Sequence, residues 1–293
     1  MEEALFDLAH AGEQLGLLEI LESGDVSIDA TQEMTTPLML ASIGGHVDCV
    51  ELLIEFGSFV DARRSTGSTA MYLASQCGHY DVVELLLRKG AMVDGMANNG
   101  ATALLIASQM GHAEVAKLLC SKGANVHLSL KDRTSPIFVA SQNGHLETIR
   151  VLDRFRADVN CRRVDGISPL WIASQMGHSH VVKYLIQSGA SVDRPRNSDG
   201  VTALLKAASK GYFDITSYIL NQHPNLGVQK CGYSPLHAAA LYGHLAVAEL
   251  LLENGANPKS RNRDGHDPAE LAMIEGHECV ANVIKMNQQT ASY

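Results

Sequence analysis

The dipeptide Gly-His recurs along this sequence at an almost constant interval. Seven copies follow this period, and Gly211-Tyr212 fills the single gap in the series: Gly45-His46, Gly78-His79, Gly111-His112, Gly144-His145, Gly177-His178, Gly243-His244 and Gly276-His277. The successive intervals are 33, 33, 33, 33, 34, 32 and 33 residues. Counting back one period from Gly45 reaches Gly12, which indicates a degenerate unit at the front. A fixed period of this length is typical of a solenoid, so we predict nine stacked units.

Each unit carries the signals of two short helices. Eight units have a residue that can cap a helix N-terminus, followed by Pro or Ala: Thr36, Thr69, Thr102, Ser135, Ser168, Thr202, Ser234 and Asp267. The cap accepts a hydrogen bond from a free backbone N–H, and Pro is favoured at the first helical position. A short apolar segment follows and ends at the Gly of Gly-His, and a second apolar segment ends near another glycine, such as Gly90. The sequence therefore predicts an all-α stack in which neighbours bury one another's apolar faces.

Neither the histidines nor the cysteines show a metal-ligand pattern. Histidines one period apart lie roughly 10 Å from each other if the helices pack at ordinary distances, whereas zinc needs ligands within about 2.0–2.3 Å. The six cysteines contain no C-x-x-C pair, which favours structural thiols in a reducing compartment. Nucleophile-elbow, P-loop, metalloprotease and dinucleotide-binding motifs are absent from the sequence. We expect no metal site, no cofactor and no enzymatic activity.

Charge and hydropathy narrow the classes of partner and location. No apolar run approaches the roughly 20 residues of a membrane helix, and the start Met1-Glu2-Glu3 lacks the basic residues of a secretory signal. We expect a cytoplasmic monomer, with access to the nucleus left open. The net charge of −9 and the 5% aromatic content disfavour nucleic-acid binding. Residues 1–62 hold 13 Asp and Glu but no Lys or Arg, which could bind a basic partner or keep a terminal repeat soluble.

The stretch Ser234-Pro235-Leu236-His237-Ala238-Ala239, with Gly243-His244 and the 33-residue period, resembles the ankyrin repeat. The resemblance extends over about residues 4–285 and implies an all-α ankyrin solenoid with a turn and two helices in each unit. The expected domain is a single array over residues 1–285, followed by a flexible tail at 286–293. Its units are about 1–33, 34–66, 67–99, 100–132, 133–165, 166–199, 200–231, 232–264 and 265–285.

Two features depart from the family pattern. The family's Thr-Pro-Leu-His histidine survives only as His237, and its position is otherwise held by Met39, Tyr72, Leu105, Phe138, Trp171 and Leu205. We expect apolar packing to replace most of the polar bridges that this histidine usually makes. The seventh unit has His223-Pro224 at its end, one extra residue before it at about 194–198, and one missing after it. The sequence leaves open whether this irregular joint is a hinge.

The resemblance also implies a binding surface on the concave side, at the ends of the first helices. Four units present a glutamine there, in the pairs Gln76-Cys77, Gln109-Met110, Gln142-Asn143 and Gln175-Met176. Glutamine amides supply donors and acceptors, and methionine makes adaptable apolar contacts. The alternative is that glutamine is only a tolerated helix former at this position.

Projecting loops, or fingers, are implied between the repeats, and they carry a predicted basic fringe. Its members are Arg63, Arg64, Lys131, Arg133, Arg162, Arg163, Arg194, Arg196, Lys230, Arg261 and Arg263. The hypothesis is an extended partner segment whose acidic residues meet this fringe, with Tyr72, Tyr233 and Tyr242 as candidate anchors and Trp171 packed inside. The alternative is an ordinary solvated set of loops.

The predicted function is therefore a non-catalytic scaffold or adaptor that binds other proteins. The alternative is a substrate-recognition subunit of a larger assembly, such as a ubiquitin ligase or a phosphatase. In addition, Leu152 with Asp158 and Asn160 resembles the setting in which asparagines of ankyrin repeats are hydroxylated. Asn160 is therefore a candidate modification site.

Overall fold

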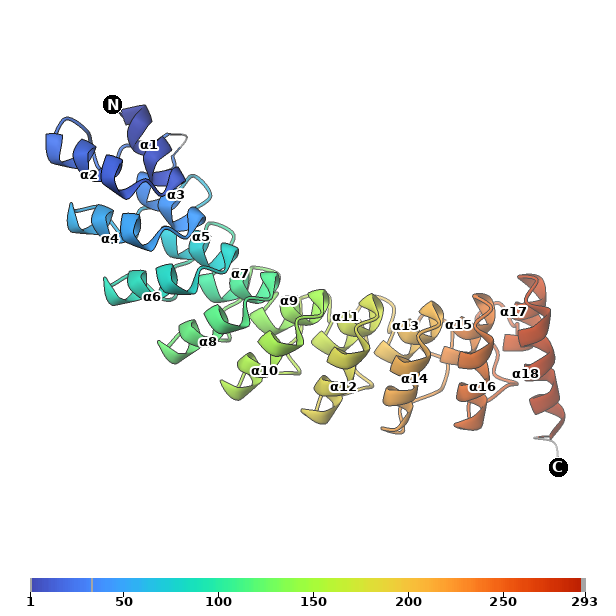
Figure 1. Ribbon diagram of the computed structural model, residues 1–293. Helices are drawn as coiled ribbons and strands as arrows, with labels where there is room; N and C mark the ends of the chain where they lie inside the picture. The colour runs from blue at the N-terminus through green and yellow to red at the C-terminus, as the bar shows by residue number, and fades with distance from the viewer. Residues whose placement is uncertain (1, 33, 291–293) are drawn as a thin grey trace. The chain divides into compact units, whose positions relative to one another are not determined.

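The computed structural model describes residues 2–32 and 34–290, and every regular element in them is an α-helix. The chain divides into two compact units, residues 1–158 (unit 1) and 159–293 (unit 2). The predicted all-α repeat fold is confirmed: the helices form nine successive pairs, α1–α2 to α17–α18, which we number as repeats one to nine (Figure 1).

The helices of both units are short and regularly spaced. Unit 1 contains α1 (Glu2–Ala11), α2 (Gln14–Ser23), α3 (Pro37–Gly44), α4 (Val47–Glu55), α5 (Ala70–Cys77), α6 (Tyr80–Arg88), α7 (Ala103–Met110), α8 (Ala113–Ser121), α9 (Pro136–Asn143) and α10 (Leu146–Arg154). Unit 2 contains α11 (Pro169–Met176), α12 (Ser179–Gln187), α13 (Ala203–Lys210), α14 (Phe213–Leu220), α15 (Pro235–Leu241), α16 (Leu245–Glu253), α17 (Pro268–Ile274) and α18 (Glu278–Thr290).

The first helix of repeats two to nine begins at the predicted cap. All eight cap side chains accept a hydrogen bond from the backbone N–H three residues on, as Ser168 does from Trp171 at 3.2 Å. At the other end, Gly78 and its counterparts adopt positive φ. Arg156 holds the position of Gly90 and Gly123 at the end of a second helix, and it too adopts a positive φ, of 64°. The helix boundaries are therefore set by local chemistry within each repeat.

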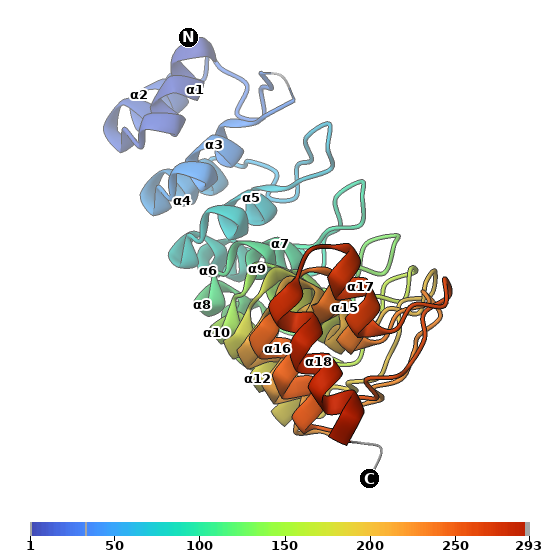
Figure 2. The ribbon, with the colours of Figure 1, turned by 90° about the vertical axis from the view of Figure 1, so that its right-hand side faces the viewer.

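Consecutive repeats bury apolar side chains between them. In unit 1, α5 packs against α7 and α7 against α9, while each first helix also contacts the second helix of its own repeat. Leu104 of α7 and Leu119 of α8 are each at most 1% exposed. Burying one such side chain stabilises the fold by about 1.5–3 kcal/mol. Within each unit the fingers that join successive repeats project to one side of the helices (Figure 2).

The Gly-His dipeptides explain the strict period. The ring of His112 covers Gly78 of the preceding repeat, and its Nε2 lies 3.0 Å from the carbonyl oxygen of Gln76. A Cβ atom on Gly78 would stand 2.6 Å from Nδ1 of that ring. The same arrangement pairs Gly12 with His46, Gly45 with His79, Gly111 with His145, Gly211 with His244 and Gly243 with His277. These histidines thus act in stacking, because each joins its own repeat to the one before it.

The expected flexible tail is corrected in part. Residues 286–290 continue α18, which runs to Thr290. The side-chain amide of Asn287 donates to the carbonyl oxygen of Val283 at 3.0 Å, and that of Gln288 donates to the carbonyl oxygen of Pro258 at 2.8 Å. The second contact ties the helix to the preceding finger, which sequence periodicity could not reveal. Residues 291–293 lie outside the described residues.

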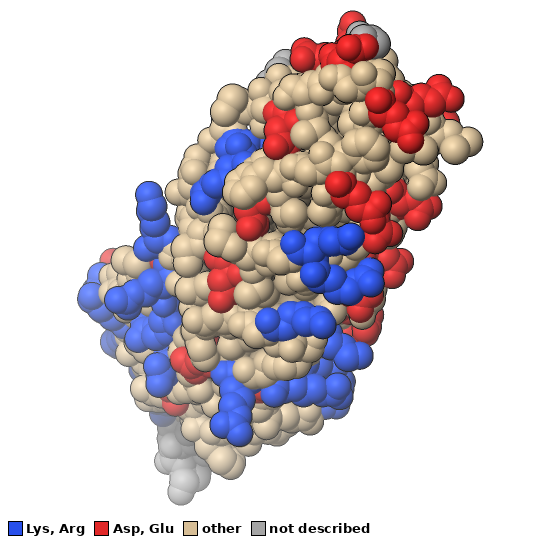
Figure 3. Space-filling model, turned by 90° about the vertical axis from the view of Figure 1, so that its left-hand side faces the viewer, with Lys and Arg blue, Asp and Glu red and all other residues tan. Residues whose placement is uncertain are grey.

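The ends of the chain differ in charge, as the sequence predicts. Asp and Glu gather over the N-terminal helices of unit 1, where no Lys or Arg precedes residue 63 (Figure 3). Among the helices that the structure describes, none combines the length and the apolar character needed to cross a bilayer.

Candidate protein-binding surface

The predicted glutamines lie at the C-terminal ends of first helices. In unit 1, Gln76, Gln109 and Gln142 are the penultimate residues of the helices α5, α7 and α9, and Gln109 is exposed while the other two are half-buried. In unit 2, Gln175 has the same place on α11. Each unit therefore presents amide groups at these helix ends to solvent.

The residues that follow the glutamines differ in whether they are free to contact a partner or are bonded to the neighbouring repeat. Met110 and Met176 are 46% and 47% exposed, so both offer apolar surface. Asn143 is exposed but donates its side-chain amide to the carbonyl oxygen of Gln109 at 2.9 Å. Asn143 therefore contributes to stacking, and the two methionines are the better candidates for contact with a partner.

Much of the predicted basic fringe holds the fingers together. The Arg63 guanidinium donates to the carbonyl oxygen of Met96 at 2.6 Å, and that of Arg162 donates to the carbonyl oxygen of Pro195 at 2.7 Å. Arg263 donates in the same way to Lys230. Each bond spans 33 residues and links one finger to the next or the preceding one. These arginines are committed to the stack, so reversing the charge of Arg162 would disturb the fold as well as any binding.

A second group of arginines is neutralised by nearby carboxylates. Arg163 lies 3.1 Å from Asp165 and Arg261 lies 3.4 Å from Glu270. Arg196 forms an ion pair with Asp199, and this contact lowers the pKa of the Asp199 carboxyl and raises the pKa of Arg196.

Four exposed cations of the fringe form neither an ion pair nor a side-chain hydrogen bond in the part of the chain that the structure describes. They are Lys131 and Arg133 in unit 1 and Arg194 and Lys230 in unit 2. Arg64 also forms none, but its side chain is half-buried in a pocket. The basic surface available to a partner is therefore smaller than the sequence suggests.

Unit 2 has the polar bridge expected at His237 and a second one at Trp171, where the sequence predicted apolar packing. His237 Nε2 lies 3.2 Å from the carbonyl oxygen of His266 in the following finger. In repeat six, Nε1 of the buried Trp171 donates to the carbonyl oxygen of Val201 at 2.8 Å, so the indole makes the bridge that a histidine would make. The expectation that apolar packing replaces the bridge is wrong at Trp171, because indole also carries an N–H donor.

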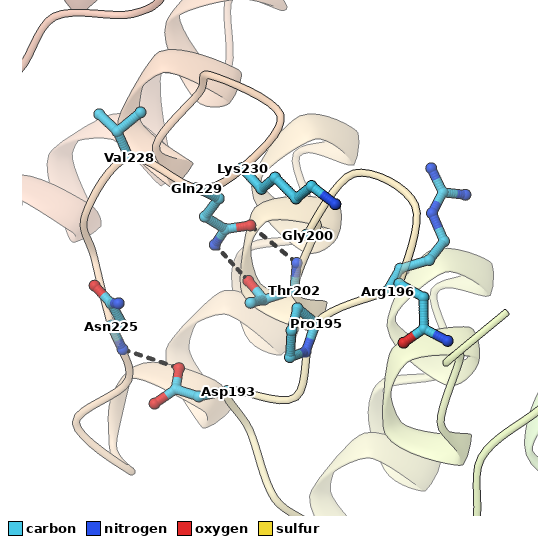
Figure 4. A pocket seen from close by; sticks show the side chains of 10 residues that line it. Asp193, Pro195, Arg196, Gly200, Thr202, Asn225, Val228, Gln229 and Lys230 are labelled. Atoms are coloured by element: carbon cyan, nitrogen blue, oxygen red, sulfur yellow. Dashed lines mark hydrogen bonds between the residues drawn. The ribbon is translucent and has the colours of Figure 1, made fainter.

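Repeat seven has a leucine at this position and uses a different bridge. The side-chain carbonyl of Gln229 accepts from the backbone N–H of Thr202 at 3.0 Å, and its amide donates to the Thr202 hydroxyl at 2.7 Å (Figure 4). Gln229 belongs to the next finger, so it satisfies the cap of α13 from outside its own repeat. No spacing rule in the sequence pointed to this contact.

The irregular spacing around repeat seven is confined to its two fingers. The register is normal up to Asn197, whose backbone N–H donates to the carbonyl oxygen of Asp165 as Asn98 does to Thr66. The extra residue therefore lies between Asn197 and Gly200. The longer finger and the shorter one after it line a pocket of about 410 Å³, bordered by Pro195, Thr202, Asn225, Val228 and Lys230 (Figure 4). The backbone of Asn225 is held there by the Asp193 carboxylate at 2.9 Å.

The stability of repeat eight is expected to fall as the pH drops below about 6.5, the ordinary pKa of histidine. Burial lowers the pKa of His237 more than its hydrogen bond to His266 raises it. The unfolded chain therefore binds a proton that the folded chain does not. The free energy of unfolding should be insensitive to this group above that pH. Below it, the loss is up to about 1.4 kcal/mol per pH unit until the pH reaches the folded pKa.

Urea denaturation monitored by circular dichroism, at a series of pH values from about 5 to 8, checks this. The matched variant is His237→Gln, which keeps an amide donor but cannot take up the proton. An equally steep loss of stability in this variant would contradict the role of His237.

The remaining candidate residues lie in different surroundings. Tyr242 is 55% exposed and stacks on His244 with 6.3 Å between ring centroids, so it is available as an anchor. Tyr233 is half-buried and meets the His237 ring edge-on, with 6.2 Å between ring centroids.

The candidate modification site Asn160 is held by two hydrogen bonds to the backbone. Its side-chain oxygen accepts from the backbone N–H of Ser191 at 2.8 Å, and its side-chain amide donates to the carbonyl oxygen of Gly189 at 3.0 Å. Its hydroxylation stays a prediction.

Comparison with known proteins identifies the repeat. The description "Ankyrin repeats (3 copies)" matches residues 5–97, 57–130, 91–163 and 137–230, and "Ankyrin repeat" matches residues 231–263. Human ankyrin repeat domain-containing protein 29 is 47% identical over 57 residues, which are 20% of this chain and 19% of that protein. Ankyrin repeat-containing protein ITN1 of Arabidopsis thaliana is 40% identical over 70 residues, 23% of this chain and 12% of that protein.

The matched relatives are otherwise diverse. The E3 ubiquitin-protein ligase Ufd4 of Drosophila melanogaster is 31% identical over 103 residues, which are 34% of this chain and 4% of that protein. The chain spans less than a fifth of the length of the first two relatives it matches. These similarities therefore concern the repeat and not the activity of any whole protein.

Proposed function

The chain belongs to the ankyrin-repeat family, whose repeats generally serve as protein-binding modules without catalytic activity, and from this we propose that it is a scaffold or adaptor. In this proposal it works in the cytoplasm and holds an extended, partly acidic segment of a partner protein. The segment lies across the ends of the first helices and the adjoining fingers.

The observation that carries the proposal is that one repeat exposes both unpaired cations on its finger and uncharged side chains at the end of its first helix. In unit 1, Lys131 and Arg133 are exposed on the finger after repeat four, and Gln109 and Met110 are exposed at the end of α7 of the same repeat. A carboxylate of the partner would pair with the cations, while its apolar groups would contact the methionine. Exposed ion pairs of this kind add about 0.2–1 kcal/mol each, so several contacts together would give affinity.

Charge reversal tests the proposal with a matched control. Lys131→Glu with Arg133→Glu should reduce the yield of partners captured from a lysate at least about tenfold, the equivalent of about 1.4 kcal/mol. The control, Lys122→Glu with Arg154→Glu, makes the same charge change at exposed positions at the C-terminal ends of second helices of unit 1. Equal loss with both pairs, or no loss with either, would contradict binding at the fingers.

The alternative function is a recognition subunit of a larger enzyme assembly. It is favoured by the stretch shared with the E3 ubiquitin-protein ligase Ufd4, a relative in which the matched residues are a small part of a long chain. Quantitative mass spectrometry of the same captures distinguishes the two functions. Stoichiometric recovery of ligase or phosphatase subunits would favour the alternative, and their absence would favour the plain adaptor.

A further inference from the structure

A pocket of about 430 Å³ opens in unit 1 between two neighbouring fingers. One wall comes from the finger after α4, which contributes Arg64 and Thr66, and the opposite wall comes from the finger after α6, which contributes Asn98. Tyr72 and Gln76 of α5 also line it. The walls are fixed to one another, because the Asn98 amide donates to the carbonyl oxygen of Ser65 at 2.7 Å. The pocket is therefore preformed.

Arg64 is the one arginine that lines this pocket, and arginines at the same position in two other fingers show how its charge differs from theirs. Three fingers carry arginine at the same position, five or six residues before the helix cap: Arg64, Arg163 and Arg196. Arg163 is paired with Asp165, two residues on, and Arg196 with Asp199, three residues on. The corresponding residue after Arg64 is Thr66, which carries no charge.

The cation of Arg64 consequently lacks a neutralising acid. It has no ion pair with any residue that the structure describes, and its Nε atom is buried without a hydrogen-bond partner. An anion that enters the pocket from outside would supply the negative charge that Asp165 and Asp199 supply to the other two arginines.

Tyr72 adds a second unused donor. It stands at the position of Trp171 and His237, whose ring N–H groups bond to the following finger, but its hydroxyl forms no hydrogen bond with the described residues. Burial raises the pKa of Tyr72, so the hydroxyl keeps its proton at neutral pH. The Gln76 side-chain amide, which lines the same pocket, also has no partner among the residues with described side chains.

We propose that this pocket binds an anionic side chain, a carboxylate or a phosphate, from an extended partner segment. Arg64 pairs with the anion, and Tyr72 and Gln76 donate hydrogen bonds to its oxygens. Guanidinium binds both groups through parallel N–H donors, and the pocket has the volume for a single side chain. The inference rests on the proposed function and names the group that the surface recognises.

The test uses small probes and the full chain labelled with ¹⁵N. N-acetylglutamate amide and N-acetyl-O-phosphotyrosine amide represent the two sources of the anion, and N-acetylglutamine amide is the neutral control. The charged probes should shift the backbone amides around Arg64, Tyr72 and Asn98 and should saturate. Their affinity should exceed that of the neutral probe at least about tenfold. The probe that binds more tightly identifies the group.

Two variants make the inference falsifiable without loss of the fold. Thr66→Asp installs the acid that the finger after α10 carries at this position, Asp165, and should weaken binding of the charged probes at least about tenfold. Arg64→Gln should do the same. Equal binding of charged and neutral probes, or unchanged binding in Thr66→Asp, would overturn the inference. Loss of probe binding alone leaves the finger charge-reversal result intact, so a failure of the pocket is distinguishable from a failure of the proposed function.

Discussion

Trp171→Ala is expected to lower the free energy of unfolding by about 3–5 kcal/mol. The side chain is 2% exposed, and its loss would leave a cavity between α11 and the following finger. It would also leave the carbonyl oxygen of Val201 without the indole N–H that donates to it at 2.8 Å. Two cations lie over the ring, Arg196 at 5.3 Å and Lys206 at 5.7 Å from its centroid, and they would lose that contact as well.

Two further variants separate packing from hydrogen bonding. Trp171→Phe keeps much of the ring but no donor, so it should cost about 1–3 kcal/mol more than a change that preserves the bridge. Trp171→His restores the donor that His237 uses in repeat eight. Urea denaturation monitored by far-ultraviolet circular dichroism measures all three, because Trp171 is the single tryptophan and its fluorescence is lost in each variant. A cost below about 1 kcal/mol for Trp171→Ala would contradict a structural role.

The sequence predicts most of the fold because its signals are local. A cap such as Thr102 accepts a hydrogen bond from the N–H of Leu105 within the same turn. The Gly after each first helix ends it by adopting a positive φ, which needs no contact with another repeat. Each repeat also carries an apolar face that it cannot bury alone, so the repeats must stack on one another. The continuation of α18 over 286–290 was missed because Gln288 is held by Pro258, a contact 30 residues away in a neighbouring repeat.

The candidate site was less predictable because it depends on contacts between repeats. Arg63 and Lys131 look alike in the sequence, but Arg63 donates to Met96 in the next finger while Lys131 is exposed. The pairing of Arg163 with Asp165 could be read from their spacing, and the same reading applied to Arg64 and Thr66 would have found the unpaired cation. The count of cations in the fingers overestimated the binding surface, since intramolecular bonds use most of them.

Gly111→Ala is expected to destabilise unit 1 by about 2–5 kcal/mol, through two separate effects. Gly111 has a φ of 82°, a conformation that costs an L-residue about 1–2 kcal/mol. In addition, a Cβ atom would stand 2.6 Å from Nδ1 of His145, whose Nε2 lies 3.0 Å from the carbonyl oxygen of Gln109. Displacing that ring costs about 1–3 kcal/mol more, as overpacking does in protein cores.

Gly123→Ala is the matched control for this change, since Gly123 has a similar φ of 90° but nothing within 4 Å of a Cβ. It should show the backbone cost alone, so the difference between the two variants measures how strongly His145 is held. The double variant Gly111→Ala with His145→Ala should cost less than the sum of its single changes, because the ring that obstructs the methyl group is gone. Hydrogen exchange of α7 to α10 and urea denaturation give both quantities. Equal losses for Gly111→Ala and Gly123→Ala would mean that the Gly-His period reflects turn conformation only and that the rings do not join the repeats.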